Sequence, residues 1–584
     1  MKKKITALLL SILMIASCFL MTACSDEEDT DGPETTTRTP VSLNFYIITD
    51  DSTTEKGIKD MQAAFNEYTE ANFTTHVEFT MVKASEYEAI LDAKFKSAAS
   101  AKKTTVSTEI QYYVDDLGMT RIKYPDIQED QLDIILITSK DMFVNYVRQG
   151  RLMQLDKATT NVYPGLLSHF SNSVVTASKV NNALYAIPNY HVMGEYTYMV
   201  VSRDAAKSVL LDSINEQYEF DTKESINNKF NGYLSFLDLA DKLRELSELS
   251  ELNPKITPFA SEFDYPNYES YSTDGSHSLI GRDPDHSSAN YSFMIDNNAY
   301  FSEYWQLMVE ARAKNYFSSE STDVGLYDAD SNPDGYAMKV VKGDYATRYD
   351  YADEIVKVIG KPTFSSDDVF SSMFAISKYT KNFDRSMEII NALTTNAELH
   401  NILQYGKEKV HYEKTASNTV TLLPGADGSV YSMNTKHTGN FFLTYPCEDI
   451  GLDPDEKVTL ANGNSEYAYI HYGKIQNSEC VTTVTASWLD KLKAIEAGQK
   501  VYTASSYSFK KIEGASEDSE YTYTKLTELL DAVNASMSGF YTDIAAATTK
   551  EDVLTIIDSY KTTYNSFKYR KNFTDNLAAF LKAL

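Results

Sequence analysis

Apolar and polar positions along the first part of the chain alternate as expected for strands separated by helices. Residues 41–49 and 76–82 alternate with period two, which predicts two strands. A capping box follows each of them, Ser52 with Glu55 and Ser85 with Glu88, ahead of apolar residues at helical spacing. Residues 133–137 form a nearly continuous apolar run, typical of a strand covered on both faces. This order predicts an α/β fold with parallel strands and right-handed crossovers.

Residues 184–204 separate this series from a second one. They contain two short apolar runs, 184–187 and 196–201, joined by a polar turn. Pro188 ends the first run because it cannot donate to a ladder, and Gly194 allows the backbone to turn before the second. The pattern predicts a connection between two α/β lobes. The alternative is a buried hairpin within one large domain.

The rest of the chain continues with mixed elements and ends in helices. Residues 101–130 lack a clear period and are interpreted as an insertion, and residues 258–292, rich in Tyr, Ser, Asp and Pro, as a long loop. Strands are expected at 337–341, 354–359 and 369–377, and helices at 235–249, 301–312, 384–395, 523–537, 551–561 and 566–584.

The N-terminus carries an export signal. Lys2–Lys4 are followed by an apolar stretch, residues 5–21, and by Thr22-Ala23-Cys24, a small-residue cleavage site. This predicts a signal peptide over residues 1–23 and lipidation of Cys24, as in a bacterial lipobox. Cys18 also fits, but cleavage there would leave an apolar segment exposed. The acidic, Thr-rich residues 24–40 predict a disordered tether.

Length and composition exclude some classes of function. At 584 residues the chain is too long for one ordinary core. The formal net charge of −29 argues against nucleic acid, because phosphate binding needs a basic surface. The 42 Tyr against 2 Trp suit surfaces that stack on ligands, although most tyrosines pack in semi-buried positions. No later segment approaches the roughly 20 apolar residues of a membrane span.

The sequence offers no cofactor motif, metal site or catalytic motif. No phosphate-binding glycine loop, HExxH or GxSxG is present, and neither an enzyme nor a cofactor is expected. Residues 328–335 resemble a calcium loop, but the glycine stands two residues late and the closing glutamate is missing, so they are interpreted as a solvated turn. Cys447 and Cys480 either form a disulfide or remain two buried thiols.

Polar residues at strand ends supply the candidate site. In such sheets ligands meet the loops at the carboxyl ends of strands. Those loops hold Asp50 and Asp51 after the first strand and Thr138 and Ser139 after the third. Helix capping is the alternative role for the last two.

In the order of its motifs the chain resembles the lipid-anchored extracellular solute-binding proteins of ABC importers, of the carbohydrate type (family 1-like). The likeness rests on Cys24 and on residues 43–50, 133–138, 150–156, 185–188, 372–377, 385–390 and 403–406. Residues 101–130 and 260–300 depart from the family, and beyond residue 450 only a helical texture matches.

The resemblance implies a two-lobed clamp with a hinge and a helical C-terminal part. Lobe 1 would comprise residues 41–187 and 345–384, and lobe 2 residues 188–344 and 385–584. The implied ligand-binding residues are Asp50, Asp51, Thr138, Ser139, Tyr190, His191, Asp344 and Tyr345. For Tyr190 and the aspartates, hinge packing and turn capping are the alternatives.

The resemblance also implies the function and the partners. A monomer anchored by lipid to the outer face of a Gram-positive cell membrane would bind a sugar or oligosaccharide and deliver it to an ABC transporter permease. A surface sensor or adhesin with the same fold, a binding protein for another polar solute, and a secreted glycosidase are the alternatives. Stoichiometric binding of a sugar without turnover would distinguish the transport binding protein from the secreted glycosidase.

Overall fold

The computed structural model describes most of the chain after residue 37. The described residues are 38–100, 110–114, 119–128, 130–210, 232–249, 256–270, 278–283, 285, 292–318, 325–483, 485–498, 523 and 525–583. The predicted signal peptide, Cys24 and residues 25–37 of the tether lie outside this part. Residues 40–584 form one compact unit, which holds every element named below. Within the described residues, no helix is long and apolar enough to cross a membrane.

Lobe 1 is built on a five-stranded sheet of order β2-β1-β5-β17-β8. β1 runs parallel to β2 and β5, and β17 is antiparallel to both β5 and β8. The whole of β5 is buried, as its apolar run predicted. The strands are β1 (Val41–Ile48), β2 (Thr75–Val82), β5 (Ile134–Ile137), β8 (Ala186–Pro188) and β17 (Met373–Ile376).

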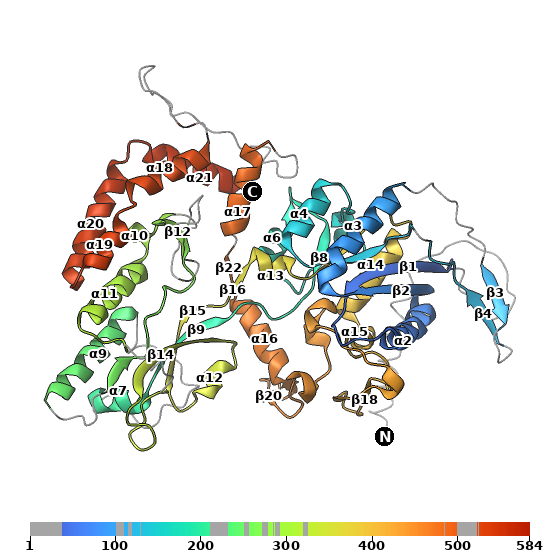
Figure 1. Ribbon diagram of the computed structural model, residues 1–584, viewed down its shortest axis with the longest axis horizontal. Coiled ribbons are helices and arrows are strands. Elements are labelled where there is room, and N and C mark those ends of the chain that lie inside the picture. The colour runs from blue at the N-terminus through green and yellow to red at the C-terminus, as the bar shows by residue number, and fades with distance from the viewer. Residues whose placement is uncertain are drawn as a thin grey trace, which may run out of the picture. The chain divides into compact units, whose positions relative to one another are not determined.

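Helices flank this sheet (Figure 1) and share its core. They are α2 (Glu55–Phe73), α3 (Ala84–Ser100), α4 (Lys140–Arg148), α14 (Phe383–Thr395) and α15 (Ala397–Tyr405). The cap of α2 is Thr54, whose side chain accepts from the Gly57 amide, so the Ser52 capping box expected from the sequence is wrong by two residues. Ser139 caps α4 as expected.

Lobe 2 is built on a four-stranded sheet of order β10-β14-β9-β15. The central β9 is antiparallel to both neighbours, and every residue of it is buried. The strands are β9 (Tyr196–Val201), β10 (Thr257–Phe259), β14 (Tyr336–Gly343) and β15 (Ile355–Gly360). The predicted architecture, α/β with two lobes, is thus confirmed, because each sheet has its own hydrophobic core.

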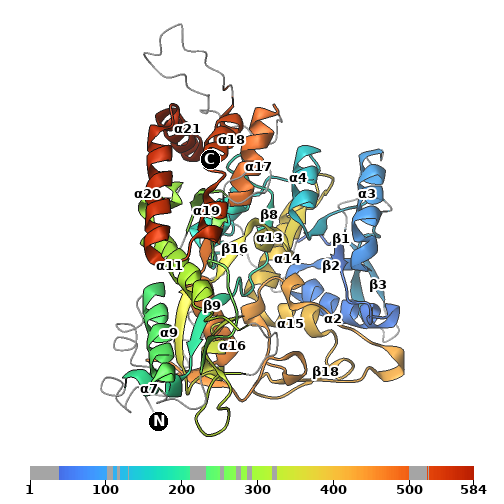
Figure 2. The ribbon, with the colours of Figure 1, turned by 60° about the vertical axis from the view of Figure 1, so that its left-hand side comes forward.

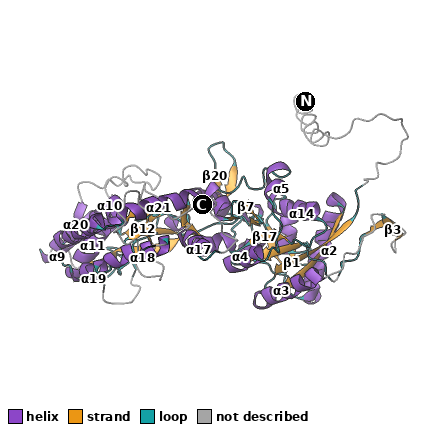
Figure 3. Cartoon of the chain, turned by 90° about the horizontal axis from the view of Figure 1, so that it is seen from above, coloured by secondary structure: helices purple, strands orange, loops and turns teal. Residues whose placement is uncertain are grey.

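The C-terminal helices belong to the core of lobe 2. Figure 2 shows α20 beside α11, and the two are in contact. Figure 3 shows α9, α11, α19 and α20 close together in this core. The helices of this core are α9 (Tyr233–Glu248), α11 (Ala299–Ala313), α17 (Thr485–Glu496), α18 (Leu526–Ser536), α19 (Phe540–Ala546), α20 (Lys550–Ser566) and α21 (Arg570–Ala583).

Three segments lie in the lobe opposite to the one expected: β15, the helices α14 and α15, and residues 428–440, whose Met433 packs in the core of lobe 1. β15 pairs with β9, so the second crossover of the chain follows Gly360 and not residue 344. α14 and α15 place Met387, Ile390 and Leu403 in the core of lobe 1, not of lobe 2. An apolar period shows that an element is half-buried but does not identify the core that covers it.

Shorter elements complete the chain. The insertion holds an exposed hairpin of β3 (Gln111–Val114) and β4 (Thr120–Lys123). β16 (Thr363–Ser365), in the second crossover, pairs with β22 (Val481–Thr483) just after α16 (Ala468–Glu479). The others are α5 (Asp156–Asn161), α6 (Asn172–Ala177), β6 (Lys179–Val180), β7 (Ala183–Leu184), α7 (Arg203–Leu210), β11 (Glu269–Ser270), β12 (Ile280–Arg282), β13 (Ser292–Phe293), α10 (Met294–Asn297), α12 (Thr347–Asp350), α13 (Ser366–Phe370), β18 (Tyr412–Lys414), β19 (Val420–Leu422), β20 (Lys457–Thr459) and β21 (Ser465–Tyr467).

Candidate functional site

The loop after β1 is held by a distant segment of lobe 1, residues 428–440. The Asp50 carboxylate accepts a hydrogen bond of 2.5 Å from the Ser432 hydroxyl. The Thr53 hydroxyl donates to the Ser432 carbonyl and accepts from the Ser432 amide. Asp51 has a side chain that is 84% exposed, 3.7 Å from the Lys83 ammonium. Asp50 is therefore fixed in one orientation, whereas Asp51 is a surface residue.

The same segment also reaches the end of β8. Asn189 is buried, and its side-chain amide donates a hydrogen bond of 2.8 Å to the Ser372 hydroxyl. Ser372 donates its own proton to the Lys436 carbonyl at 2.7 Å and lies 2.9 Å from Nδ1 of His437. Because the Ser372 proton is used, its oxygen must accept from His437, so Nδ1 of His437 carries the proton. Nε2 of His437 is left as an acceptor.

His191 has the same tautomer. Its Nδ1 is 3.0 Å from the Asn189 carbonyl, which can only accept, so Nδ1 donates and Nε2 is an acceptor. Burial lowers the pKa of His191. Burial, and then the neighbouring His191, lower the pKa of His437 to about 4. Asp50 interacts electrostatically with His437 as well. These three side chains form an acceptor group at neutral pH: a carboxylate and two uncharged imidazoles.

Helix α16 ties the first crossover to the segment after β14. The side-chain amide of Asn477 donates a hydrogen bond of 2.8 Å to the backbone carbonyl of His191. The neighbouring Gln476 accepts from the Tyr345 amide at 2.9 Å and donates to the Gly194 carbonyl at 2.6 Å. His191 and Tyr345, predicted from distant parts of the sequence, are therefore bonded to consecutive residues of one helix.

Close packing supports the same junction. A Cβ on Gly473 would lie 2.6 Å from a methyl group of Val192, so α16 lies directly against the first crossover. Gly194 has a positive φ of 66°, and a Cβ there would lie 2.4 Å from the Thr363 carbonyl. The two crossovers therefore touch, and only glycine fits at this contact.

A stack of three tyrosines lies beside the junction. Tyr345 stacks on Tyr472 and Tyr472 on Tyr349, each pair with ring centroids 5.2 Å apart. The guanidinium carbon of Arg348 is 3.7 Å from the centroid of the Tyr345 ring. Tyr345 is buried, whereas Tyr349 is 42% exposed. The tyrosine stack (Tyr345, Tyr349, Tyr472) thus runs from the interior of lobe 2 to its surface.

The remaining predicted residues have structural contacts. The ring centroids of Tyr190 and Phe442 are 4.7 Å apart. The backbone of Tyr190 forms hydrogen bonds with the backbone of Gly439 and of Phe441. Asp344 accepts from the amide and the hydroxyl of Thr347, as a turn-capping residue does. Their ligand role stays a prediction.

Thr138 and Ser139 also have local partners. Ser139 accepts from the Met142 amide at the start of α4, and the Thr138 hydroxyl lies 3.7 Å from the Met142 sulfur. Of the eight predicted residues, the contacts above connect Asp50, His191 and Tyr345, with Tyr190 and Asp344 adjoining them in sequence. The contacts described above do not connect Thr138, Ser139 or Asp51 to that group.

Sequence reasoning missed half of this arrangement. The missed residues are Ser372, Ser432, His437, Tyr472, Gln476 and Asn477. The segment 428–440 has no apolar period and few regular elements, so nothing linked it to strand ends far earlier in the chain. The adjacent Gln476 and Asn477 on α16 were the available signal, because amide side chains that become buried, as Gln476 does, need fixed partners.

The candidate calcium loop and the two cysteines were the remaining features that the sequence singled out. Over the described ranges, no three His, Cys, Asp or Glu side chains are placed to hold a metal ion. The Asp328 carboxylate instead accepts from the amides of Asp330 and Ser331, closing the turn expected there. Cys447 and Cys480 are both free, so no disulfide joins them; Cys447 is buried, as the two-thiol alternative expected, and Cys480 is partly buried.

Comparison with known proteins gives one local sequence relative and several distant structures. No family model matches the chain. The carbohydrate ABC transporter substrate-binding protein of Streptococcus pneumoniae serotype 4 is 42% identical over 79 residues. That match spans 13% of this chain and 16% of the relative. The resemblance drawn from the motifs, to carbohydrate-type solute-binding proteins, is confirmed over that segment.

Three solved structures are similar along most of the chain. The N-glycan transport solute-binding protein NgtS from Streptococcus pneumoniae has 17% identity and a TM-score of 0.46, over 93% of this chain and 99% of its own. Its complex with Man5GlcNAc has 16% identity and a TM-score of 0.39, over 93% and 98%. An extracellular solute-binding protein from Bifidobacterium longum subsp. infantis has 12% identity and a TM-score of 0.42, over 94% and 99%.

Proposed function

We propose that this protein captures a neutral oligosaccharide outside the cell and delivers it to the permease of an ABC importer, without catalysis. The observation that carries the proposal is that α16 links the two groups: Asn477 donates to the His191 backbone carbonyl, and Tyr472 of the same helix is the middle ring of the tyrosine stack. Sugars present hydroxyl donors around rings whose C–H faces are apolar. Fixed acceptors, together with an aromatic ring that reaches the surface at Tyr349, match that surface.

The charge of the site favours a neutral solute. Asp50 is a carboxylate, and His191 and His437 present lone pairs, so the acceptor group calls for donors on the ligand. The net charge of −29 repels anions at long range. Neutral hydroxyls meet both conditions, and an acidic peptide or a phosphate meets neither.

A thermal-shift screen tests the proposal. The panel runs from monosaccharides to neutral oligosaccharides and includes Man5GlcNAc. A ligand at 100 times its dissociation constant stabilises the folded state by about 2.7 kcal/mol, so a true solute raises the melting temperature visibly. A panel in which no sugar raises it, while another polar solute does, would contradict the carbohydrate assignment.

The variant Tyr472→Ala tests whether the tyrosine stack binds the solute. Because Tyr472 is the middle ring of the stack, its removal should weaken binding of the oligosaccharide found in the screen at least tenfold, about 1.4 kcal/mol. The melting temperature without solute should change less than the affinity, since the ring is only partly buried. Tyr112→Ala, on the exposed β3–β4 hairpin, is the matched control and should bind as the unchanged protein does. Equal affinity of all three proteins would remove the stack from the site.

The export signal predicts an anchor on the outer face of the membrane. Cys24→Ala should release the protein from the membrane fraction, because the lipidated thiol would be lost. Cys18→Ala is the control and should remain bound. Fractionation with the opposite result would move the cleavage site to Cys18.

A further inference from the structure

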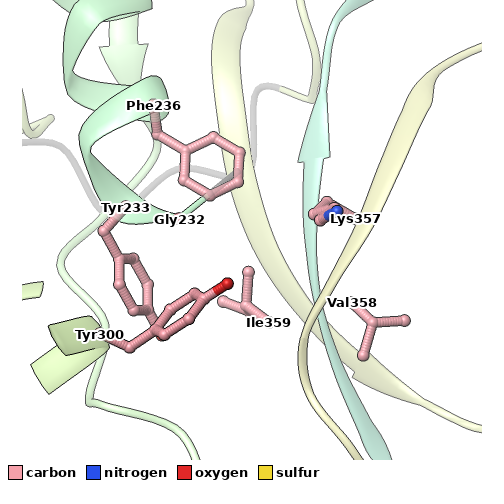
Figure 4. A pocket seen from close by; sticks show the side chains of 7 residues that line it. All are labelled: Gly232, Tyr233, Phe236, Tyr300, Lys357, Val358 and Ile359. Carbon is pink, nitrogen blue, oxygen red and sulfur yellow. The ribbon is translucent and has the colours of Figure 1, made fainter. Parts of the chain in front are cut away.

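The cavity of lobe 2 is too small for a solute. It lies at the beginnings of α9 and α11 and beside β15, and Figure 4 shows Phe236 and Tyr300 on one side of it and Lys357 on the other. Its volume of about 50 Å³ is far below the roughly 300 Å³ at which ligand pockets begin. The cavity admits a few water molecules. A further contact surface is instead indicated on the exterior of lobe 1.

Four strongly exposed apolar side chains gather on the hairpin of β3 and β4. Tyr112, Tyr113, Val114 and Met119 are 51–66% exposed. β3 and β4 pair with each other and with no other described strand. Figure 1 and Figure 3 both show the hairpin standing apart from the sheet of lobe 1. Single exposed apolar residues are ordinary, but several on one hairpin mark a contact surface.

The hairpin has two chemically different faces. Side chains alternate along a strand, and the two members of a cross-strand pair point to the same face. One face carries Tyr112, Val114, Thr120 and Ile122, and the opposite face carries Gln111, Tyr113, Arg121 and Lys123. A ribbon with one apolar and one basic face is the strand counterpart of an amphipathic helix that lies in a membrane interface. Tyrosine is enriched at that depth of a bilayer.

The charge of this segment also suits a lipid surface. Four basic and three acidic residues give residues 101–124 a formal charge of +1, whereas the whole chain carries −29. The charged residues of the segment are Lys102, Lys103, Glu109, Asp115, Asp116, Arg121 and Lys123. Anionic headgroups attract basic segments and repel an acidic surface. The hairpin can therefore approach a bilayer without the repulsion that the acidic remainder of the chain meets.

The predicted membrane tether enters lobe 1 beside the base of the hairpin. Val41, the first residue of β1, pairs with Thr75 of β2. The next residue of β2, His76, has its ring centroid 5.8 Å from that of Tyr124, which directly follows β4. The tether, residues 24–40, has an expected end-to-end distance of about 20–25 Å. Because strands of four residues are about 13 Å long, the anchor brings the hairpin within reach of the bilayer.

We propose that the β3–β4 hairpin is a second membrane contact, which lies with its apolar face in the lipid interface. The tether raises the effective concentration of lipid at the hairpin, so a weak interaction suffices. The inference rests on the proposed anchoring to the outer face of the membrane and is independent of the solute. A second copy of the chain is the alternative partner. Pairing with it would use the strand edges and would leave the apolar face uncovered.

Fluorescence on tethered vesicles tests the contact. Residues 25–584 hold the whole compact unit, and an N-terminal histidine tag binds them to nickel-chelating lipid in vesicles of equimolar phosphatidylglycerol and phosphatidylcholine. An environment-sensitive fluorophore is attached to Tyr112→Cys on the apolar face or to Tyr113→Cys on the opposite face. Leu249→Cys, an exposed apolar site after α9, is the matched control. Each protein also carries Cys480→Ser, and the remaining Cys447 is buried.

Doxyl-labelled lipid should quench the probe at Tyr112→Cys at least about twofold more strongly than either other probe, because only the apolar face enters the interface. Equal quenching at the three positions, or none, would overturn the membrane contact. Since the tag replaces the natural lipid, this result does not depend on lipidation of Cys24, so failure of the anchor and failure of the hairpin contact are distinguished.

Amide hydrogen exchange gives a check without a label. Exchange in β3 and β4 should be slower in the tethered protein than in solution, because an isolated hairpin is only marginally stable and the bilayer would cover it. Tyr112→Ser combined with Val114→Ser removes the apolar face and should abolish this slowing. An untethered dimer that the same double variant dissociates would assign the hairpin to a second copy and overturn the assignment to lipid.

Discussion

Acidification from neutral pH to about pH 4 is expected to remove about 3 kcal/mol from the free energy of unfolding through His400 alone. His400 is fully buried in lobe 1. Its Nδ1 lies 2.9 Å from the Thr438 carbonyl and its Nε2 2.9 Å from the Thr444 hydroxyl. Burial lowers the pKa of this imidazole from 6.5 to about 4.

The sign follows from where the proton binds. As the pH falls below 6.5, the unfolded chain takes up a proton on His400, whereas the folded chain does not until about pH 4. The contribution of His400 to the free energy of unfolding is therefore fully present above pH 6.5 and is lost as the pH falls from 6.5 to about 4. Below the lower value this contribution changes no further.

Urea unfolding at several pH values measures this effect. His400→Asn retains a donor for the Thr438 carbonyl but cannot be protonated. The variant is expected to be less stable at neutral pH and to lose less stability on acidification than the unchanged protein. Carboxylates contribute to both proteins alike, so their difference isolates His400. Parallel pH profiles would show that His400 is not the acid-sensitive group.

Gln476→Leu is expected to lower both stability and solute affinity. Gln476 is 1% exposed and bonds to the Tyr345 amide and to the carbonyls of Met193 and Gly194. Leucine has a similar volume but leaves these buried backbone groups unpaired. Each such group costs about 1–3 kcal/mol, so the free energy of unfolding should fall by about 3 kcal/mol.

Binding should weaken at least tenfold, because the first crossover and the segment carrying Tyr345 lose their common support. Denaturant unfolding and titration with the oligosaccharide measure the two effects. Lys474→Gln, which removes the α16 partner of an ion pair with Glu466 of β21, is the control and should change neither by more than about 0.5 kcal/mol. A Gln476→Leu protein that binds normally would mean that α16 does not organise the site.

The elements of the fold were more predictable than their assembly. The alternation in β1 and the continuous run in β5 record local burial, and both strands lie where the sequence predicts them. The lobe of β15 and of α14 depends on packing partners hundreds of residues away, which no local period records. The second crossover was therefore placed too early in the chain.

The candidate site divides in the same way. Asp50 follows a strand, so the rule for strand ends found it, whereas His191 was implied by the family resemblance from its place at the first crossover. His437 and Tyr472 lie in the C-terminal part and meet the others only through side-chain hydrogen bonds and ring stacking. Their roles depend on tertiary contacts, and the sequence carries no spacing from which such contacts could be read.

Isothermal titration of the unchanged protein with the best sugar of the screen, followed by analysis of the recovered sugar, tests the central claim most directly. The acceptor group and the tyrosine stack predict saturable binding of one sugar per protein, with the sugar recovered intact. Absence of binding by any neutral sugar, or recovery of a cleaved sugar, would contradict the account.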